Sequence, residues 1–221
     1  TWLSLDTPHD GLLVRAESHV TVVRRKLPAP ADSPPWERVR EGFLYRPEPH
    51  SRERLDAERY LYASPRVPRD AALADFARQA FTPGLPLLAG AKALMDLIFK
   101  TFTFDAEATE VNTPVHDVLK RKRGVCQDFA HLMIAALRSL GLAARYVSGY
   151  LLTHPPEGQP RLVGADASHA WVAVWCPLHG WVALDPTNDV RVGQDHVTLA
   201  WGRDYADVAP LRGVIRGGGT A

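Results

Sequence analysis

The sequence predicts an α+β fold in which a helical first half packs on an antiparallel sheet formed by the second half. Between residues 70 and 140, apolar residues recur at helical spacing, three and four positions apart. From residue 144 onward, apolar residues instead form short runs of strand length. Because helices come first and strands follow, the two kinds of element are segregated along the chain, as they are in α+β proteins.

Length and composition exclude several classes of protein. A chain of 221 residues has room for one domain and a smaller additional region, and it can fold without a metal or a disulfide. Its 26 basic and 25 acidic residues are balanced, which excludes nucleic-acid binding through bulk charge. The longest apolar run has seven residues, whereas a membrane-spanning helix needs about twenty, so we expect no membrane partner. No signal peptide is visible, and two cysteines make no disulfide framework, so the sequence predicts a reduced, cytoplasmic setting.

The N-terminal region carries a strand pattern. Residues 2–5 and 12–23 alternate apolar and polar side chains, and the segment between them, residues 7–11, has the composition of a turn. This pattern predicts a β-hairpin. Since an isolated hairpin is only marginally stable in water, we interpret residues 1–27 as the remnant of an N-terminal β region. Its exposed edge could pair with a second copy of the chain to give an edge-strand dimer.

Proline marks the boundary to the main domain. Residues 28–49 contain six prolines, which lack the N–H donor that a sheet interior requires. We therefore predict that residues 28–68 form a connector and that residues 69–216 form the main domain. Three consecutive glycines indicate a flexible tail over residues 217–221.

Capping residues and periodicity predict four helices in the main domain. Asp70 is placed to cap the first helix, and Thr113 is placed to cap the third, with Pro114 at its first position. Gly141 ends the fourth helix. The helices are predicted over residues 71–81, 87–102, from 114 onward and 126–140, and four strands follow over residues 144–152, 169–175, 181–184 and 196–201.

Cys126 is the first candidate for chemistry, because it stands at the predicted start of the fourth helix. The free N–H groups of a helix N-terminus and the basic run at residues 120–123 both favour a thiolate there. A thiolate is a nucleophile, so the position suits covalent catalysis. The alternative is a small buried hydrophobic residue, a common role for an unpaired cysteine.

His169 and Asp185 stand at the ends of two predicted neighbouring strands, sixteen residues apart. His169 opens its strand, from which its imidazole can exchange a proton with a thiol at the helix start. Asp185 closes the next strand, and antiparallel pairing would set its carboxylate beside the imidazole to orient it. Alone, His169 could be a polar strand-end residue, and Asp185 a turn residue before Pro186. Together with Cys126, they give a nucleophile, a base and an orienting acid in one chain order.

Five segments of the chain resemble the bacterial transglutaminase-like cysteine enzymes, and the resemblance covers about residues 70–215. The segments are GVCQDFA at 124–130, ARYVSGY at 144–150, SHAWV at 168–172, the stretch from Gly-Trp to Leu-Asp-Pro-Thr-Asn at 180–188, and GRDYADVAP at 202–210. The resemblance implies a papain-like fold with Cys126 as nucleophile, His169 as base and Asp185 as orienting residue, and it implies no cofactor. Members of the family also carry an N-terminal β region, which agrees with the interpretation of residues 1–27.

The oxyanion donors and the substrate contacts are less well defined. The backbone N–H of Cys126 is one candidate oxyanion donor. Related enzymes take a second donor from an upstream Trp or Gln, but the nearest upstream Trp here is Trp36, and Lys120 stands at the position of the Gln. The candidate substrate-binding or oxyanion residues are Gln127, Trp171 and Tyr205.

Two hypotheses of different classes follow. The first is cysteine-dependent acyl transfer on an amide or peptide bond of a peptide or protein substrate, through a thioester. Hydrolysis is favoured over transamidation, because water is always present. The second is a non-catalytic module that binds a peptide or protein in the same cleft. No Cys or His pair has the spacing of a zinc site with a matching second pair, so no metal is expected, and we interpret the basic run as a solvated turn rather than a nucleic-acid site.

Overall fold

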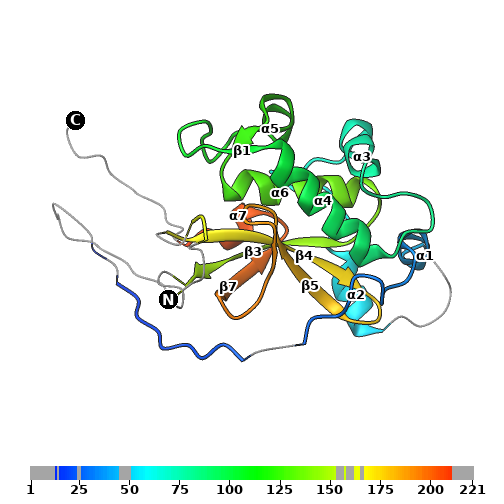
Figure 1. The fold of residues 1–221 in the computed structure, drawn as a ribbon, viewed down its shortest axis with the longest axis horizontal. Helices are drawn as coiled ribbons and strands as arrows, with labels where there is room; N and C mark the ends of the chain where they lie inside the picture. The colour runs from blue at the N-terminus through cyan, green and yellow to red at the C-terminus, as the bar shows by residue number, and fades with distance from the viewer. Residues whose placement is uncertain are drawn as a thin grey trace, which may run out of the picture.

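A computed structural model describes residues 13, 15–23, 26–44, 51–152, 157, 162–164 and 167–210. Its centre is a five-stranded antiparallel sheet, and helices cover one face of that sheet (Figure 1). The central helix is α6 (Cys126–Ser139), which packs directly on strands β3 (Ala144–Leu151) and β4 (His169–Cys176). The predicted arrangement of helices on an antiparallel sheet is therefore confirmed.

The four predicted helices are all present, with small differences at their ends. The first is α3 (Ala71–Arg78), and the Asp70 side chain caps it by accepting a hydrogen bond from the Leu73 backbone. It ends three residues earlier than predicted, but Ala80 and Phe81 stay buried, as its apolar stripe required. The others are α4 (Leu87–Thr101), α5 (Val115–Arg121) and α6. Pro114 has a ψ of 143° and so stands before α5 as its N-cap, not inside it.

The four predicted strands are also present, but their topology differs from a simple meander. β3, β4, β5 (Gly180–Asp185) and the short β6 (Val190–Arg191) are joined in sequence. β7 (His196–Gly202) then crosses back to pair with β3, which gives the order β6-β5-β4-β3-β7. This crossing brings the start of β4, the end of β5 and the start of β7 to the same end of the sheet.

The segment 28–68 is not the connector that the sequence predicted. It contains two helices, α1 (Trp36–Gly42) and α2 (Arg52–Glu58), and its buried apolar residues belong to the main core. The Trp36 indole N–H donates to the Thr82 carbonyl, and the Trp36 ring packs edge-on against Phe81. Each helix has only seven residues, too few for a clear periodicity, and prolines placed just before α1 are compatible with a helix start.

The predicted N-terminal hairpin is wrong for the part of its second arm that the structure describes. Residues 15–23 belong to no strand and are mostly exposed. A strand needs a partner for its backbone hydrogen bonds, and within the described ranges this segment has none. The first arm at residues 2–5 and the tail at 217–221 lie outside the described residues, so the β-region remnant and the edge-strand dimer stay predictions.

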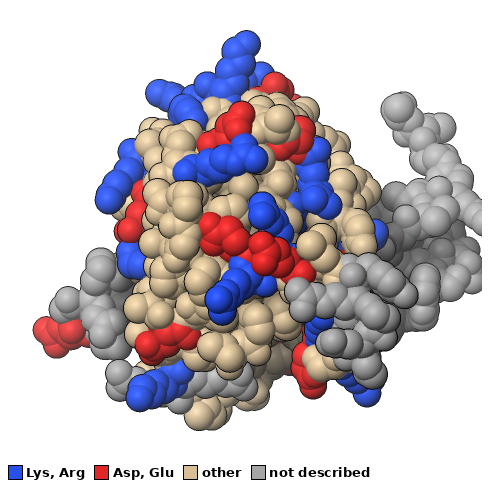
Figure 2. Space-filling model, turned by 90° about the vertical axis from the view of Figure 1, so that its right-hand side faces the viewer, with Lys and Arg blue, Asp and Glu red and all other residues tan. Residues whose placement is uncertain are grey.

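Three short elements complete the fold. β1 (Thr103–Phe104) and β2 (Arg123–Gly124) form a parallel pair next to the start of α6, and α7 (Tyr205–Val208) follows β7. On the face shown in Figure 2, acidic and basic side chains are interspersed, in keeping with the balanced composition. In the part of the chain that the structure describes, no helix has the length and apolar character needed to cross a membrane.

Candidate active site

Cys126 is the first residue of α6, and the chain before it is fixed by two sets of contacts. The β1–β2 ladder holds Gly124, and the Asp128 carboxylate accepts hydrogen bonds from the Val125 N–H at 2.8 Å and the Thr109 hydroxyl at 2.6 Å. A Cβ at Gly124 would lie 2.7 Å from the Asp128 carboxylate, so only glycine fits there. Burial raises the pKa of Asp128, against the opposing effect of these two hydrogen bonds. The half-buried thiol therefore stands on a rigid helix start.

His169 and Asp185 meet as the predicted antiparallel pairing requires. β4 and β5 pair with Val172 opposite Leu184, which sets the start of one strand beside the end of the other. The His169 Nε2–H donates to the Asp185 carboxylate at 2.8 Å, and both side chains are fully buried. The carboxylate therefore fixes the orientation of the ring and the nitrogen that faces away from Asp185.

Three further groups hold the Asp185 carboxylate. The Thr187 backbone N–H donates to Oδ1 at 3.0 Å, and the Asn188 side-chain amide donates to Oδ2 at 2.8 Å. His196 Nε2 lies 3.3 Å from the same Oδ2. Burial by itself raises the pKa of Asp185, but the hydrogen bonds from His169, His196 and Asn188 outweigh it and hold this pKa well below its usual range. Asp185 is therefore an anion at neutral pH.

The environment of His169 favours its protonated form. Burial lowers the pKa of His169, but Asp185 and Cys126 more than compensate and raise it to about 9. Because Asp185 occupies Nε2, the nitrogen left for Cys126 is Nδ1, which is buried and has no other hydrogen-bond partner among the described residues. The arrangement can hold a thiolate–imidazolium pair, the resting state of an activated cysteine.

A short segment of the β3–β4 connection packs against the His169 imidazole close to Nδ1. Val163 is held by Asn188, whose side-chain oxygen accepts from the Val163 N–H at 2.8 Å and whose amide donates to the Val163 carbonyl at 3.2 Å. The next residue, Gly164, has a φ of +90°, and a Cβ there would lie 2.6 Å from His169 Nδ1. The same asparagine therefore contacts both Asp185 and the segment that covers His169.

This contact gives a first prediction. Replacing Gly164 with alanine is expected to lower kcat/KM by about 10–100-fold, because the added methyl group displaces the imidazole from the cysteine. Gly84→Ala is the matched control, since Gly84 also has a positive φ of +77° but no atom lies within 4 Å of its Cβ position. Steady-state kinetics of both variants separates the two effects. Equal losses in both would mean that backbone strain, not contact with His169, is responsible.

The three other candidate residues have different surroundings. The Gln127 side-chain amide donates to the Val111 carbonyl at 3.0 Å, so it holds a neighbouring loop. Trp171 is fully buried, so it has no surface for substrate. Its indole packs against the rings of His169 and His196 and supports both of them. Tyr205 is half-buried, and its backbone N–H donates to His131 Nε2 at 3.1 Å. Burial lowers the pKa of His131 to about 4, so this ring is neutral and can accept that bond.

Sequence reasoning missed four residues near the site. Asn188 and Gly164 are described above, and His196 contacts Asp185. Tyr146 of β3 faces α6, where its ring lies 5.0 Å from that of His131. Burial, and then the charge of Cys126, raise the pKa of the Tyr146 phenol well above its ordinary value. Asn188 and Tyr146 had a sequence signal, since they lie in the Leu-Asp-Pro-Thr-Asn stretch and in the ARYVSGY segment.

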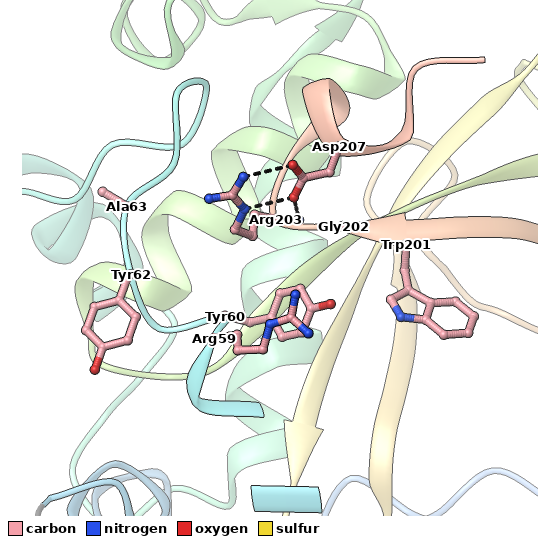
Figure 3. A pocket seen from close by; sticks show the side chains of 8 residues that line it. All are labelled: Arg59, Tyr60, Tyr62, Ala63, Trp201, Gly202, Arg203 and Asp207. Carbon is pink, nitrogen blue, oxygen red and sulfur yellow. Dashed lines mark hydrogen bonds and ion pairs between the residues drawn. The ribbon is translucent and has the colours of Figure 1, made fainter. Parts of the chain in front are cut away.

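One cavity of the described structure is lined by none of Cys126, His169 and Asp185. It has a volume of about 520 Å³ and lies at the far end of β7 from His196, next to Trp201 and Arg203 (Figure 3). Arg203 makes a two-pronged ion pair with Asp207 at 2.9 Å on its rim. Within the described ranges, no group of three or more His, Cys, Asp or Glu residues is placed to hold a metal.

Comparisons with known proteins agree on one family. A family model described as the transglutaminase-like superfamily matches residues 74–186. An uncharacterized protein of Mycobacterium tuberculosis is 41% identical over 222 residues, which cover 97% of this chain and 68% of that protein. A protein-glutamine gamma-glutamyltransferase of Pseudomonas aeruginosa is 34% identical over 149 residues, which cover 65% of this chain and 22% of that protein.

One solved structure supports the fold directly. It is a candidate cysteine protease from Cytophaga hutchinsonii, which superposes with a TM-score of 0.58 at 30% identity. The match covers 70% of this chain and 49% of that protein, so this chain spans about half of its length. The family match over residues 74–186 includes Cys126, His169 and Asp185.

Proposed function

Because the chain belongs to the transglutaminase-like superfamily, with its papain-like fold, we propose that it is a cysteine-dependent acyl-transfer enzyme acting on amide or peptide bonds. The observation that carries this proposal is the position of His169. Its imidazole is bound to a buried Asp185 at 2.8 Å, and its other nitrogen is left for Cys126 at the start of α6. Nucleophile, proton carrier and orienting anion each stand on a regular element.

The proposed mechanism has two halves. The Cys126 sulfur attacks the carbonyl carbon, and the His169 imidazolium gives its proton to the nitrogen of the departing amine, which leaves a thioester on Cys126. Neutral His169 then takes a proton from water or a second amine as that molecule attacks the thioester carbonyl, and the C–S bond breaks to release the acid or amide and restore the Cys126 thiolate and the His169 imidazolium. The backbone N–H of Cys126 has no hydrogen-bond acceptor among the described residues, so it is available to the oxyanion.

We propose hydrolysis rather than transamidation as the main outcome. A peptide or protein substrate is expected, in line with the candidate cysteine protease to which the chain is similar. The protein-glutamine gamma-glutamyltransferase relative makes a glutamine side chain the natural amide to test beside peptide bonds. Both reactions use the same thioester, so the nucleophile that reaches it decides the product.

Product analysis tests this proposal. The protein is incubated with a pool of synthetic peptides that includes glutamine-containing ones, with and without methylamine, and the products are identified by mass spectrometry. We expect new carboxylates in both conditions, an acyl adduct on Cys126 at short times, and no turnover by Cys126→Ala. Cys176→Ser is the matched control, because Cys176 is buried and burial raises the pKa of its thiol.

The other outcomes contradict the proposal in different ways. Methylamides as the main product would show a transglutaminase. Peptides that bind to the wild-type protein without turnover, and bind equally well to Cys126→Ala, would show a non-catalytic binding module.

A further inference from the structure

His196 is a buried polar residue for which the proposed reaction has no step. It opens β7 opposite Leu151 of β3, and its side chain is 2% exposed. The ring packs edge-on against the Trp171 indole, with the centroids 5.2 Å apart. An imidazole in such a place is costly to bury unless it forms a hydrogen bond.

The two nitrogens of His196 have unequal surroundings. Nε2 lies 3.3 Å from Oδ2 of Asp185, whereas Nδ1 is buried and has no partner in the part of the chain that the structure describes. An imidazolium would leave an N–H donor unpaired at Nδ1, in contact with apolar groups. A neutral ring with its proton on Nε2 leaves only a lone pair there and donates to the Asp185 carboxylate. The geometry therefore selects the neutral Nε2–H tautomer.

Resting on the proposed function, we propose that His196 is a positioning residue that fixes the Asp185 carboxylate from strand β7 and so holds the His169 ring towards Cys126. Asn188 and Thr187 follow β5, the strand that ends at Asp185, and His169 belongs to the neighbouring strand β4. These three donors therefore come from the same strand as Asp185 or from the next one. Among the described donors to Asp185, His196 is the one that comes from β7, which lies beyond β3 in the sheet. The Trp171 indole packs against the imidazoles of both His169 and His196.

The donor that His196 supplies has a direct effect on the charge of Asp185. The titratable groups that face this carboxylate are His169 from β4 and His196 from β7, and Cys126 of α6 faces the far side of His169. Thr187 and Asn188 are neutral. Removing one donor from a buried carboxylate destabilises its ionised form, so Asp185 would take up a proton at a higher pH. The His169 ring would also be held less firmly towards Cys126 and would stabilise the thiolate less, so the acid limb of activity should move to higher pH.

Two variants separate a positioning role from a packing role. In His196→Gln the side-chain amide can still donate from about the position of Nε2, whereas in His196→Leu the volume is kept and the donor is lost. We expect the leucine variant to lose about tenfold in kcat with KM unchanged, and its acid limb to move to higher pH, while the glutamine variant recovers most of both. His179→Leu is the control, since His179 is exposed and bonds to the Asp32 carbonyl.

The same variants are read without substrate through alkylation of Cys126 by iodoacetamide against pH. The leucine variant should need a higher pH to react at the wild-type rate, and the glutamine variant should not. Equal behaviour of the two variants would overturn the positioning role. A wild-type Cys126 that reacts no faster than Cys176 would instead contradict the proposed function itself.

A measurement on the wild-type protein covers the case in which His196→Leu does not fold. The ¹⁵N resonances of His196 report its protonation state directly. We expect a protonated Nε2 and an unprotonated Nδ1 at neutral pH. An Nδ1–H tautomer at neutral pH would remove the donor to Asp185 and contradict the proposal, and an imidazolium would contradict the neutral tautomer that the geometry selects.

Discussion

Replacing His169 with alanine is expected to lower kcat/KM by roughly 10²–10⁴-fold, because the variant loses the group that carries the proton in both halves of the reaction. The pH profile should change with it. The pKa of His169 is raised to about 9, so the imidazolium is present at neutral pH and is lost as the pH rises through about 9. The wild-type rate should therefore fall on the alkaline side near that value, and the variant should lack this limb.

The measurement is kcat/KM between about pH 5 and pH 10 for the wild-type protein, His169→Ala and the control His179→Ala. The control removes an exposed imidazole that bonds to the Asp32 carbonyl, so its profile should match that of the wild type. Circular dichroism of each variant establishes that the fold is retained. An alkaline limb that persists unchanged in His169→Ala would show that another group carries the proton.

The position of Cys126 could be predicted because its signals are local. Gly124, the amphipathic stripe of α6 and the following Gly141 mark a helix that begins at the cysteine, and the structure begins the helix there. His169 and Asp185 could be paired because a short connection between two strands makes antiparallel neighbours. His169 and Asp185 form the hydrogen bond that this pairing requires, and the catalytic roles of Cys126, His169 and Asp185 stay a prediction.

The supporting residues could not be predicted, because their partners depend on tertiary topology. His196 was predicted at the start of a strand, but its contact with Asp185 exists only because β7 crosses back beside β3. The helix α1 was missed for a similar reason. Seven residues give too little periodicity, and the burial of Trp36 depends on Thr82 and Phe81, more than forty positions away.

Arg138 is the clearest case of a residue whose role its sequence context conceals. A basic residue in the last turn of a helix is ordinarily solvated, yet Arg138 of α6 is fully buried. Its guanidinium donates to the carbonyls of Ala144, Tyr62 and Arg203 and to the Ser64 hydroxyl. These acceptors come from the start of β3, from the segment after α2 and from the end of β7. One side chain therefore joins three parts of the chain.

Replacing Arg138 with methionine is expected to lower the free energy of unfolding by about 3–5 kcal/mol, because it removes a buried bond to the Ala144 carbonyl and part-buried bonds to two further carbonyls. Burial lowers the pKa of Arg138 only to about 10, so the lost group is a cation at neutral pH and its hydrogen bonds are charge-assisted. Arg138→Lys should lose less stability than Arg138→Met, since its ammonium keeps the charge. It should still be less stable than wild type, because an ammonium cannot reach all of the acceptors that the guanidinium spans. Urea unfolding followed by circular dichroism gives the three free energies.

Arg78→Met is the control, because Arg78 is an exposed helical arginine paired with Asp75 on the same helix, and exposed pairs contribute at most about 1 kcal/mol. Arg138 lies twelve residues from Cys126 on one helix, about 18 Å away, so the folded fraction of Arg138→Met should keep kcat/KM within about twofold of wild type. A loss of activity larger than the loss of folded protein would show that Arg138 also positions the start of α6. A loss of stability no larger than that of Arg78→Met would instead show that burying the cation costs as much as its hydrogen bonds contribute.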